Sequence, residues 1–149
     1  MLPLFAQELS TSCVAACVRM ALAALGFSLT ESEIRSRCGH SGLGMRLNQV
    51  AQGLADLPVQ AEYHTDWSID DLTEAVRRSV FPIVGVDLRF VDGLFAFHAL
   101  VIADVMSDEI IVHDPRDAHS PRNISLRTFE EAWESADREC LVIEMKQQV

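Results

Sequence analysis

The stretch that decides the fold runs from Gln7 to Gly26 and reads QELSTSCVAACVRMALAALG. From Cys13 onward, small and apolar side chains recur every three to four residues, which is the spacing of one face of an α-helix. Hydroxyl residues at positions 10–12 can cap a helix at its start, and Gly26 is a natural terminator. We therefore expect a helix from Cys13 to about Leu25, buried along one broad face, whose alanines allow close packing against a sheet.

Three more helical segments and a strand are expected between residues 30 and 79. A capping-box pattern at 30–33 predicts a short helix to about residue 37. Residues 45–54 have apolar side chains at helical spacing. The strand is expected over 59–63, and Ser68 with Asp71 predicts a further helix to about residue 79.

The second half is rich in β-branched and aromatic residues. Strands are predicted over 81–88, 96–105, 109–113 and 140–145, with a hairpin turn at 106–108. A second capping box, Thr128–Glu131, is expected to begin a short helix that ends near Ser135. Helices followed by an antiparallel sheet make the predicted fold class α+β, with the N-terminal helices packed on the sheet.

Composition limits the classes of function. The 149 residues include 22 acidic and 12 basic side chains, which gives a formal net charge of −10. Such a surface repels phosphate backbones, so we expect no nucleic-acid partner. An apolar fraction of 49% and a charged fraction of 23% are typical of a folded globular protein. We expect a single domain over residues 1–149.

The sequence indicates a cytoplasmic protein. Its start has no basic region and is interrupted by Gln7 and Glu8, so no signal peptide is expected. The apolar stretch from Cys13 to Leu25 contains Arg19 and is shorter than a membrane span, so no membrane segment is expected in this chain. In that setting the cysteines are interpreted as reduced thiols, at positions 13, 17, 38 and 140.

No metal or phosphate site is predicted. Cys38 and His40 offer two ligands, but no second Cys/His pair stands at zinc-site spacing. The segment 42–44, Gly-Leu-Gly, lacks the glycine pattern and the Lys-Ser/Thr ending of a phosphate loop. We expect it to be a loop that lines or flanks a cleft.

Cys13 is the candidate nucleophile. A thiol attacks as its thiolate, and an ordinary thiol has a pKa of about 8.5. The free N–H groups and the dipole at a helix N-terminus favour the negative charge. The alternative is that Cys13 is a small core residue like its neighbour Cys17, since free cysteines are often buried.

His98 and Asp114 are the candidate partners of that thiol. Folding the chain about the predicted turn at 106–108 brings His98 opposite the region of Asp114, within a residue or two. A carboxylate there would fix the imidazole tautomer and favour its charged form. The alternatives are a hydrogen-bonded core histidine and a turn-initiating Asp-Pro pair. His113 is a weaker candidate, because alternation along the strand points it to the other face.

Gln7 completes the candidate site. Its side-chain amide can donate to an oxyanion beside the backbone N–H of Cys13. The alternative is a solvated surface residue, and only the spacing to Cys13 favours the first interpretation.

Taken together, three parts of the chain resemble one known family. The first is Gln7-x5-Cys13-x-x-Ala16-Cys17-x-x-Met20-x-Leu22, followed by Gly26. The others are residues 98–102 with 112–115, and the Phe-x-x-x-Trp element at 129–133. In order and spacing they resemble the opening, the histidine and aspartate blocks, and the following element of C39-type and C39-like peptidases of the papain superfamily. The resemblance covers nearly the whole chain.

This resemblance implies a papain-like fold and a role for each candidate residue. Cys13 is then the nucleophile, His98 the general acid and base, Asp114 the residue that orients the imidazole, and Gln7 the oxyanion-hole donor. The implied reaction is hydrolysis of a peptide bond through a thioester, which needs no cofactor.

The best understood members of this family remove leader peptides after a Gly-Gly pair, commonly as domains fused to export transporters. The implied substrate is therefore a peptide or protein, such as a leader peptide or other precursor, and the implied association is with a transporter or partner protein. The sequence departs from the family where Val14 replaces the usual glycine, a change that we expect to narrow the site and to bear on leader-type specificity. Two alternatives stay open: an acyl transferase or amidase with the same triad, and a non-catalytic C39-like peptide-binding module.

Overall fold

An antiparallel sheet of six strands, in the order β1-β6-β2-β3-β4-β5, forms the centre of the molecule. The computed structural model describes residues 1–147, without the side chain of Ser120. The strands are β1 Val59–His64, β2 Ile83–Asp87, β3 Phe97–Val105, β4 Glu109–Asp114, β5 Asp117–Ser125 and β6 Cys140–Met145.

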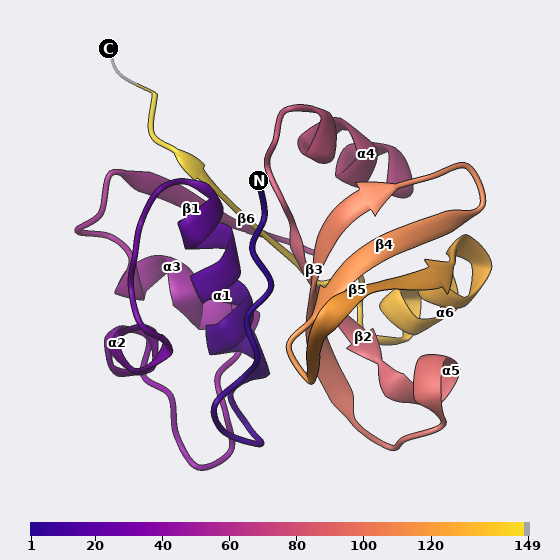
Figure 1. The fold of residues 1–149 in the computed structure, drawn as a ribbon, viewed down its shortest axis with the longest axis horizontal. Coiled ribbons are helices and arrows are strands. Elements are labelled where there is room, and N and C mark those ends of the chain that lie inside the picture. The colour runs from indigo at the N-terminus through magenta and orange to yellow at the C-terminus, as the bar shows by residue number, and fades with distance from the viewer. Residues whose placement is uncertain (148–149) are drawn as a thin grey trace.

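Helices cover both faces of this sheet. The helices are α1 Cys13–Ala24, α2 Glu31–Arg37, α3 Val50–Gly53, α4 Ile69–Arg77, α5 Leu88–Asp92 and α6 Leu126–Ser135. In Figure 1 the first three helices gather on one side of the molecule, and α4, α5 and α6 lie on the other side with strands β3 to β5. The predicted α+β fold with N-terminal helices packed on an antiparallel sheet is confirmed.

Alternation along β3 sends neighbouring residues into two separate cores. Ala99 and Val101 are buried in the core that contains α1. Leu100 and Ile102 are buried in the core that contains α6. The small side chains of α1 let this helix lie close to the sheet, and its end at Ala24, with Gly26 at φ +96°, matches the expected end near Leu25.

Several local expectations are also confirmed. The capping boxes that start α2 and α4, at Thr30 and Ser68, are both formed. The strands expected from the β-rich runs occur with ends shifted by at most two residues, and the turn at 106–108 joins β3 to β4. Within residues 1–147 no helix has both the length and the apolar character needed to cross a membrane.

Two expected helices differ in their starts. The helix expected over 45–54 is a 3₁₀ turn, Leu47–Gln49, followed by the short α3. The Gln49 side chain closes this turn, because it accepts from the Arg46 N–H at 3.0 Å and donates to the Cys38 carbonyl at 2.7 Å. Helix α6 begins at Leu126 rather than at Thr128, because the Ser125 hydroxyl accepts the N–H of Thr128 at 3.2 Å.

Helix α5 and strand β5 are not predicted by any pattern in the sequence. Strand β5 is polar and contains Pro121, which a strand tolerates here because β5 lies at the edge of the sheet. Helix α5 has five residues and ends at Gly93, whose φ of +71° closes the helix in the left-handed region. A helix this short depends on tertiary contacts for its stability.

Candidate active site

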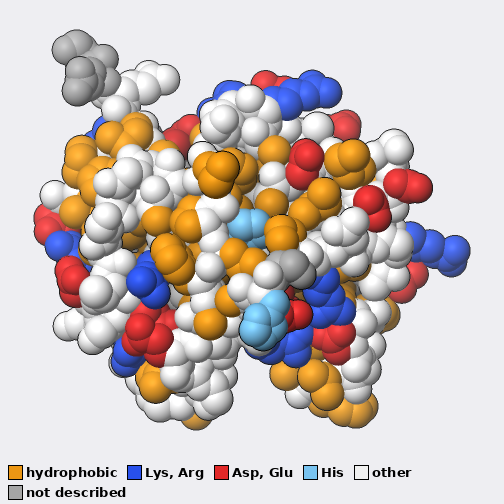
Figure 2. Space-filling model, in the orientation of Figure 1, with side chains coloured by type: hydrophobic (Ala, Val, Ile, Leu, Met, Phe, Trp, Pro, Cys, Tyr) orange, Lys and Arg blue, Asp and Glu red, His pale blue; other side chains and the backbone are white. Residues whose placement is uncertain are grey.

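A cleft of about 790 Å³ lies between the start of α1 and the start of β3. One side of it is lined by Ser10, Thr11, Cys13, Val14 and residues 43–48, and much of the other by Leu94, residues 96–99, Ala136, Asp137 and Glu139. Figure 2 shows the outline of the molecule indented between its helical half and its sheet half, with hydrophobic side chains on both sides of the indentation. The loop containing Gly42, Leu43 and Gly44 borders this cleft, as expected for a loop that lines or flanks it.

The loop fits closely against the segment before α1. Gly44 has a φ of +101°, and a Cβ built on it would lie 3.1 Å from the Thr11 carbonyl oxygen. Both the backbone conformation and the close approach therefore require glycine at this position. The loop that lines the cleft therefore packs directly against the segment that precedes Cys13.

Cys13 is the first residue of α1 and is partly exposed in the cleft. Ser12 stands at the N-cap position, but its hydroxyl accepts the Leu9 N–H at 2.9 Å and directs its one proton to the Leu9 carbonyl, at 3.0 Å, and Glu31 Oε1, at 3.1 Å. The expected side-chain cap is therefore absent from α1. The N–H groups of its first turn stay available to a negative charge near the thiol.

The surroundings of Cys13 stabilise its thiolate. Burial alone would raise the pKa of this thiol, but the hydrogen bond and charge of His98 lower it below its ordinary value. Backbone N–H groups of Ala99 and Val14 lower it further. The other cysteines differ, because burial raises the pKa of Cys17, Cys38 and Cys140.

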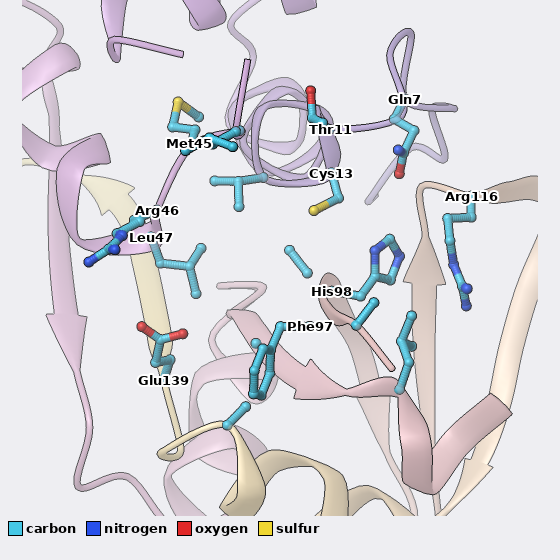
Figure 3. Close-up of a pocket in the computed structure, with 18 of the residues that line it drawn as sticks. Gln7, Thr11, Cys13, Met45, Arg46, Leu47, Phe97, His98, Arg116 and Glu139 are labelled. Carbon is cyan, nitrogen blue, oxygen red and sulfur yellow. The ribbon is translucent and has the colours of Figure 1, made fainter. Parts of the chain in front are cut away.

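His98 lies at the start of β3, lines the same cleft as Cys13 and contacts a carboxylate. Its Nε2 lies 2.7 Å from Oδ1 of Asp114, and both side chains are buried. Burial would lower the pKa of His98, but its hydrogen bonds to Asp114 and Cys13 outweigh burial and raise that pKa. Figure 3 shows the sulfur of Cys13 and the ring of His98 facing the same part of the cleft.

Asp114 is held from several directions at the end of β4. Its Oδ1 accepts the backbone N–H of Arg116 at 2.9 Å as well as His98, and its Oδ2 lies 3.2 Å from the Arg116 guanidinium and 3.5 Å from that of Arg122. Burial would raise the pKa of Asp114, but the bonds from His98 and Arg116 hold it well below the usual range. Asp114 is therefore an anion at any pH near neutrality.

His113 faces away from this group, as alternation predicts. Its Nδ1 lies 2.9 Å from the carbonyl oxygen of Pro3, so this histidine ties the N-terminal segment to β4. The same segment is also hydrogen-bonded to the turn after Asp114, because the backbone N–H of Gln7 donates to the Pro115 carbonyl at 2.9 Å.

Gln7 lines the cleft, but the N–H group of its side-chain amide is already hydrogen-bonded within the protein. Nε2 donates to the Leu9 carbonyl at 2.8 Å, and the buried Oε1 has no hydrogen-bond partner among the described residues. Figure 3 places Gln7 on the same side of the thiol as Arg116. The residue is near the thiol, and its role as an oxyanion donor stays a prediction that requires rotation of the amide.

Sequence reasoning missed three charged residues around Asp114. Arg116 carried a weak signal, because it stands two residues after Asp114. Asp92 and Arg122 carried none, because they lie in α5 and β5, the two elements without a sequence pattern. Among the described residues, no group of three or more His, Cys, Asp or Glu side chains is arranged to hold a metal ion.

Fold and cleft together define an α+β protein in which a thiol and an imidazole line one cleft and a buried carboxylate contacts the imidazole. The sequence model of the Peptidase C39 family matches residues 2–147, and the chain belongs to that family. No curated protein is similar enough in sequence to match it.

Solved structures share this fold at low sequence identity. A protein from Bacillus anthracis described as a C39-like peptidase has a TM-score of 0.83 and 14% identity, over 99% of this chain and 96% of that one. The peptidase domain of Streptococcus ComA, a bifunctional ABC transporter of a quorum-sensing pathway, gives 0.76 and 16% over 99% and 100%. A double-glycine-motif protease of an AMS/PCAT transporter, in complex with its leader peptide, gives 0.76 and 17% over 98% and 93%.

Proposed function

We propose that this protein is a cysteine peptidase that cleaves a leader peptide or another peptide precursor in the cytoplasm. The observation that carries the proposal is that Cys13 and His98 line the same cleft and that 2.7 Å separates His98 Nε2 from Asp114 Oδ1. The lowered pKa of Cys13 and the raised pKa of His98 favour the thiolate–imidazolium pair that such a nucleophile needs.

In the proposed reaction, Cys13 Sγ attacks the carbonyl carbon of the scissile peptide bond. The carbonyl oxygen becomes an oxyanion, stabilised by the Cys13 backbone N–H and by the Gln7 amide after it turns from Leu9. The tetrahedral intermediate collapses as the C–N bond breaks, and the imidazolium of His98 donates its proton to the leaving amine. The acyl group is then a thioester on Cys13.

Water completes the cycle. His98, now neutral, takes a proton from a water molecule, and the resulting hydroxide attacks the thioester carbonyl. Collapse of the second tetrahedral intermediate breaks the C–S bond and releases the carboxylic acid product. The thiolate of Cys13 and the imidazolium of His98 are then restored. Asp114 keeps its charge throughout and orients the ring.

The rim of the cleft supports a peptide substrate. Leu43, Leu94 and Phe97 line the cleft and are 99%, 49% and 69% exposed. Large exposed apolar side chains at the border of a cleft mark a site for an apolar partner segment. Two of the structural neighbours belong to transporters, and one is bound to a leader peptide. We accordingly propose a precursor peptide as substrate and a transporter or another partner protein as the source of that peptide.

The test is cleavage of Gly-Gly-containing precursor peptides, followed by product mass. Cys13→Ala should abolish cleavage, whereas Cys140→Ala, a buried cysteine of the opposite core, should leave it intact. Cleavage that survives in Cys13→Ala would overturn the proposal. A product mass that shows an added amine instead of water would indicate an acyl transferase. Peptide binding without any turnover in the unmodified protein would indicate a binding module.

A further inference from the structure

Three charged side chains outside the proposed triad form a closed group next to Asp114. Asp92 ends α5, Arg116 lies in the turn between β4 and β5, and Arg122 lies in β5. Asp92 Oδ2 accepts from Arg116 at 2.5 Å, while Arg122 donates to both Asp92 oxygens at 2.5 Å and 3.1 Å. We call these three residues the arginine clamp.

The clamp has a buried side and an outer side. Asp114 is 1% exposed, whereas the side chains of Asp92, Arg116 and Arg122 are 25%, 30% and 31% exposed. Each arginine therefore stands between the buried carboxylate of Asp114 and the outer carboxylate of Asp92. The two arginines hold the pKa of Asp92 below its ordinary value, so this outer carboxylate is also ionised near neutrality.

The two carboxylates share the positive charge of the same two guanidinium groups. Asp92 partly neutralises the two guanidinium groups and so lowers the positive potential that they produce at the Asp114–His98 pair. Loss of Asp92 would therefore raise that positive potential, because the guanidinium groups lie at short range from the pair. The position of Asp92 is otherwise without benefit to its own helix, because an acidic residue at a helix C-terminus gains nothing from the helix dipole.

We propose that the arginine clamp positions Asp114 and sets the pH range over which the Cys13–His98 pair is charged. This inference rests on the proposed function, in which that charged pair is the reactive state. Asp92, Arg116 and Arg122 do not touch the thiol, so they act as positioning residues through Asp114.

The charged and titratable groups that face His98 and Asp114 come from several elements. They are Cys13 and Cys17 of α1, Arg116 of the β4–β5 turn and Arg122 of β5. Burial raises the pKa of Cys17, so it stays a neutral thiol near pH 7. The arginines stay charged. The protonation of the Cys13–His98 pair is therefore the quantity that changes near neutral pH.

The sign of the effect follows from the charge removed. Arg122→Gln removes a positive charge, which favours protonation and should shift both limbs of the pH profile of Cys13 reactivity to higher pH. Asp92→Asn removes a negative charge and should shift both limbs to lower pH. Each shift should be about 0.5 pH unit or more, given unit charges within several ångströms in a partly buried site. The double variant should return near the original profile.

The experiment measures the rate of iodoacetamide alkylation of Cys13 by peptide mapping in the full chain, from pH 5 to 9. Arg127→Gln and Asp56→Asn are the matched controls, because they remove the same charges at exposed sites. Opposite shifts in Arg122→Gln and Asp92→Asn, with neither control moving the profile, support the inference. Shifts of the same sign, no shift, or equal shifts in the controls would overturn it.

The same experiment separates this inference from the proposed function. If Cys13 of the unmodified protein reacts no faster than an ordinary thiol, the proposed function fails. If Cys13 is activated but the two clamp variants keep its profile, only the clamp inference fails. Thermal unfolding of each variant, followed by circular dichroism, identifies a variant that has lost its fold. If a charge-removing variant does not fold, the charge-conserving variant at the same position, Arg122→Lys or Asp92→Glu, is measured in its place. Its pH profile should match that of the unmodified protein, because the charge is kept.

Discussion

At the residue scale, the thiol of Cys13 is distinguished from the other thiols by what surrounds it. Its uncapped helix start and its bond to His98 favour the thiolate, whereas Cys17, one turn later on the same helix, lies fully buried with a raised pKa. The same residue type therefore has opposite chemistry four positions apart.

We predict that iodoacetamide modifies Cys13 selectively below pH 7. An ordinary thiol reacts appreciably only near its pKa of about 8.5, whereas the pKa of Cys13 is lowered mainly by His98 against the effect of burial. His98→Ala should therefore move the reaction towards pH 8.5. Intact mass and peptide mapping measure it. Equal labelling of Cys13 in the protein and in its His98→Ala variant at pH 6 would contradict the prediction.

The Asp114→Asn substitution should lower peptide cleavage by about 10²-fold, within the range that general acid–base catalysis contributes. The asparagine keeps the shape of the side chain but loses the charge that favours the imidazolium of His98. Cleavage rates at saturating peptide measure the effect. Asp108→Asn, in the exposed turn between β3 and β4, is the control. A cleavage rate unchanged by Asp114→Asn would show that His98 works without this carboxylate.

At the element scale, short segments are held in place by buried carboxylates. Helix α5 is anchored at its start by Asp87, which accepts from Arg89 at 2.7 Å and from Ser135 of α6 at 2.7 Å. The segment before α1 is anchored by Glu31 of α2, which accepts from the Glu8 N–H at 2.9 Å and from Ser12. These bonds hold the segments that carry Asp92 and Cys13, and in each case one partner, Ser135 or Glu31, is remote in sequence from the segment it holds.

Glu31→Ala should destabilise the protein by about 1–3 kcal/mol, because it leaves the Glu8 N–H without its acceptor and removes the bonds of Ser12 and Arg35 to this carboxylate. The segment before Cys13 should also loosen and slow the alkylation of that thiol. Urea unfolding and the alkylation assay measure the two effects. Glu33→Ala is the control, since it breaks a capping box of the same helix without touching this segment. If Glu31→Ala and Glu33→Ala lowered stability and alkylation rate equally, the effects would come from a weakened α2 and not from the segment before Cys13.

At the scale of the whole molecule, the two cores and the paired carboxylates together determine stability. Asp87, Asp92 and Asp114 all have pKa values held below the ordinary range, with Arg89, Arg122 and His98 as their respective main hydrogen-bonding partners. A carboxyl group whose pKa is lower in the folded state stabilises the fold above its unfolded pKa of about 3.9. That contribution is lost as pH falls through the folded pKa.

The free energy of unfolding should therefore fall steadily as the pH is lowered from about 5 to 3. Asp87→Asn should have lower stability at pH 6 but a flatter dependence on pH, because one of the linked carboxyl groups is gone. Urea unfolding at several pH values measures both. Parallel curves for the protein and the variant would show that Asp87 contributes no linkage.

The sequence by itself determined the local elements and the identity of the candidate residues. Capping residues at Thr30 and Ser68 and the apolar spacing after Cys13 predicted helices, because these signals act within one or two turns. The hairpin about 106–108 likewise placed His98 near Asp114, since a tight turn fixes which residues face each other.

Only the tertiary structure decided the surroundings of those residues. The arginine clamp, the turned amide of Gln7 and the anchors of α5 depend on contacts between segments distant in sequence. Such contacts leave no periodic signal, because each depends on the packing of a whole sheet and not on the spacing of neighbours. The sequence therefore predicts which groups meet in the cleft, and the folded chain determines their charge and orientation.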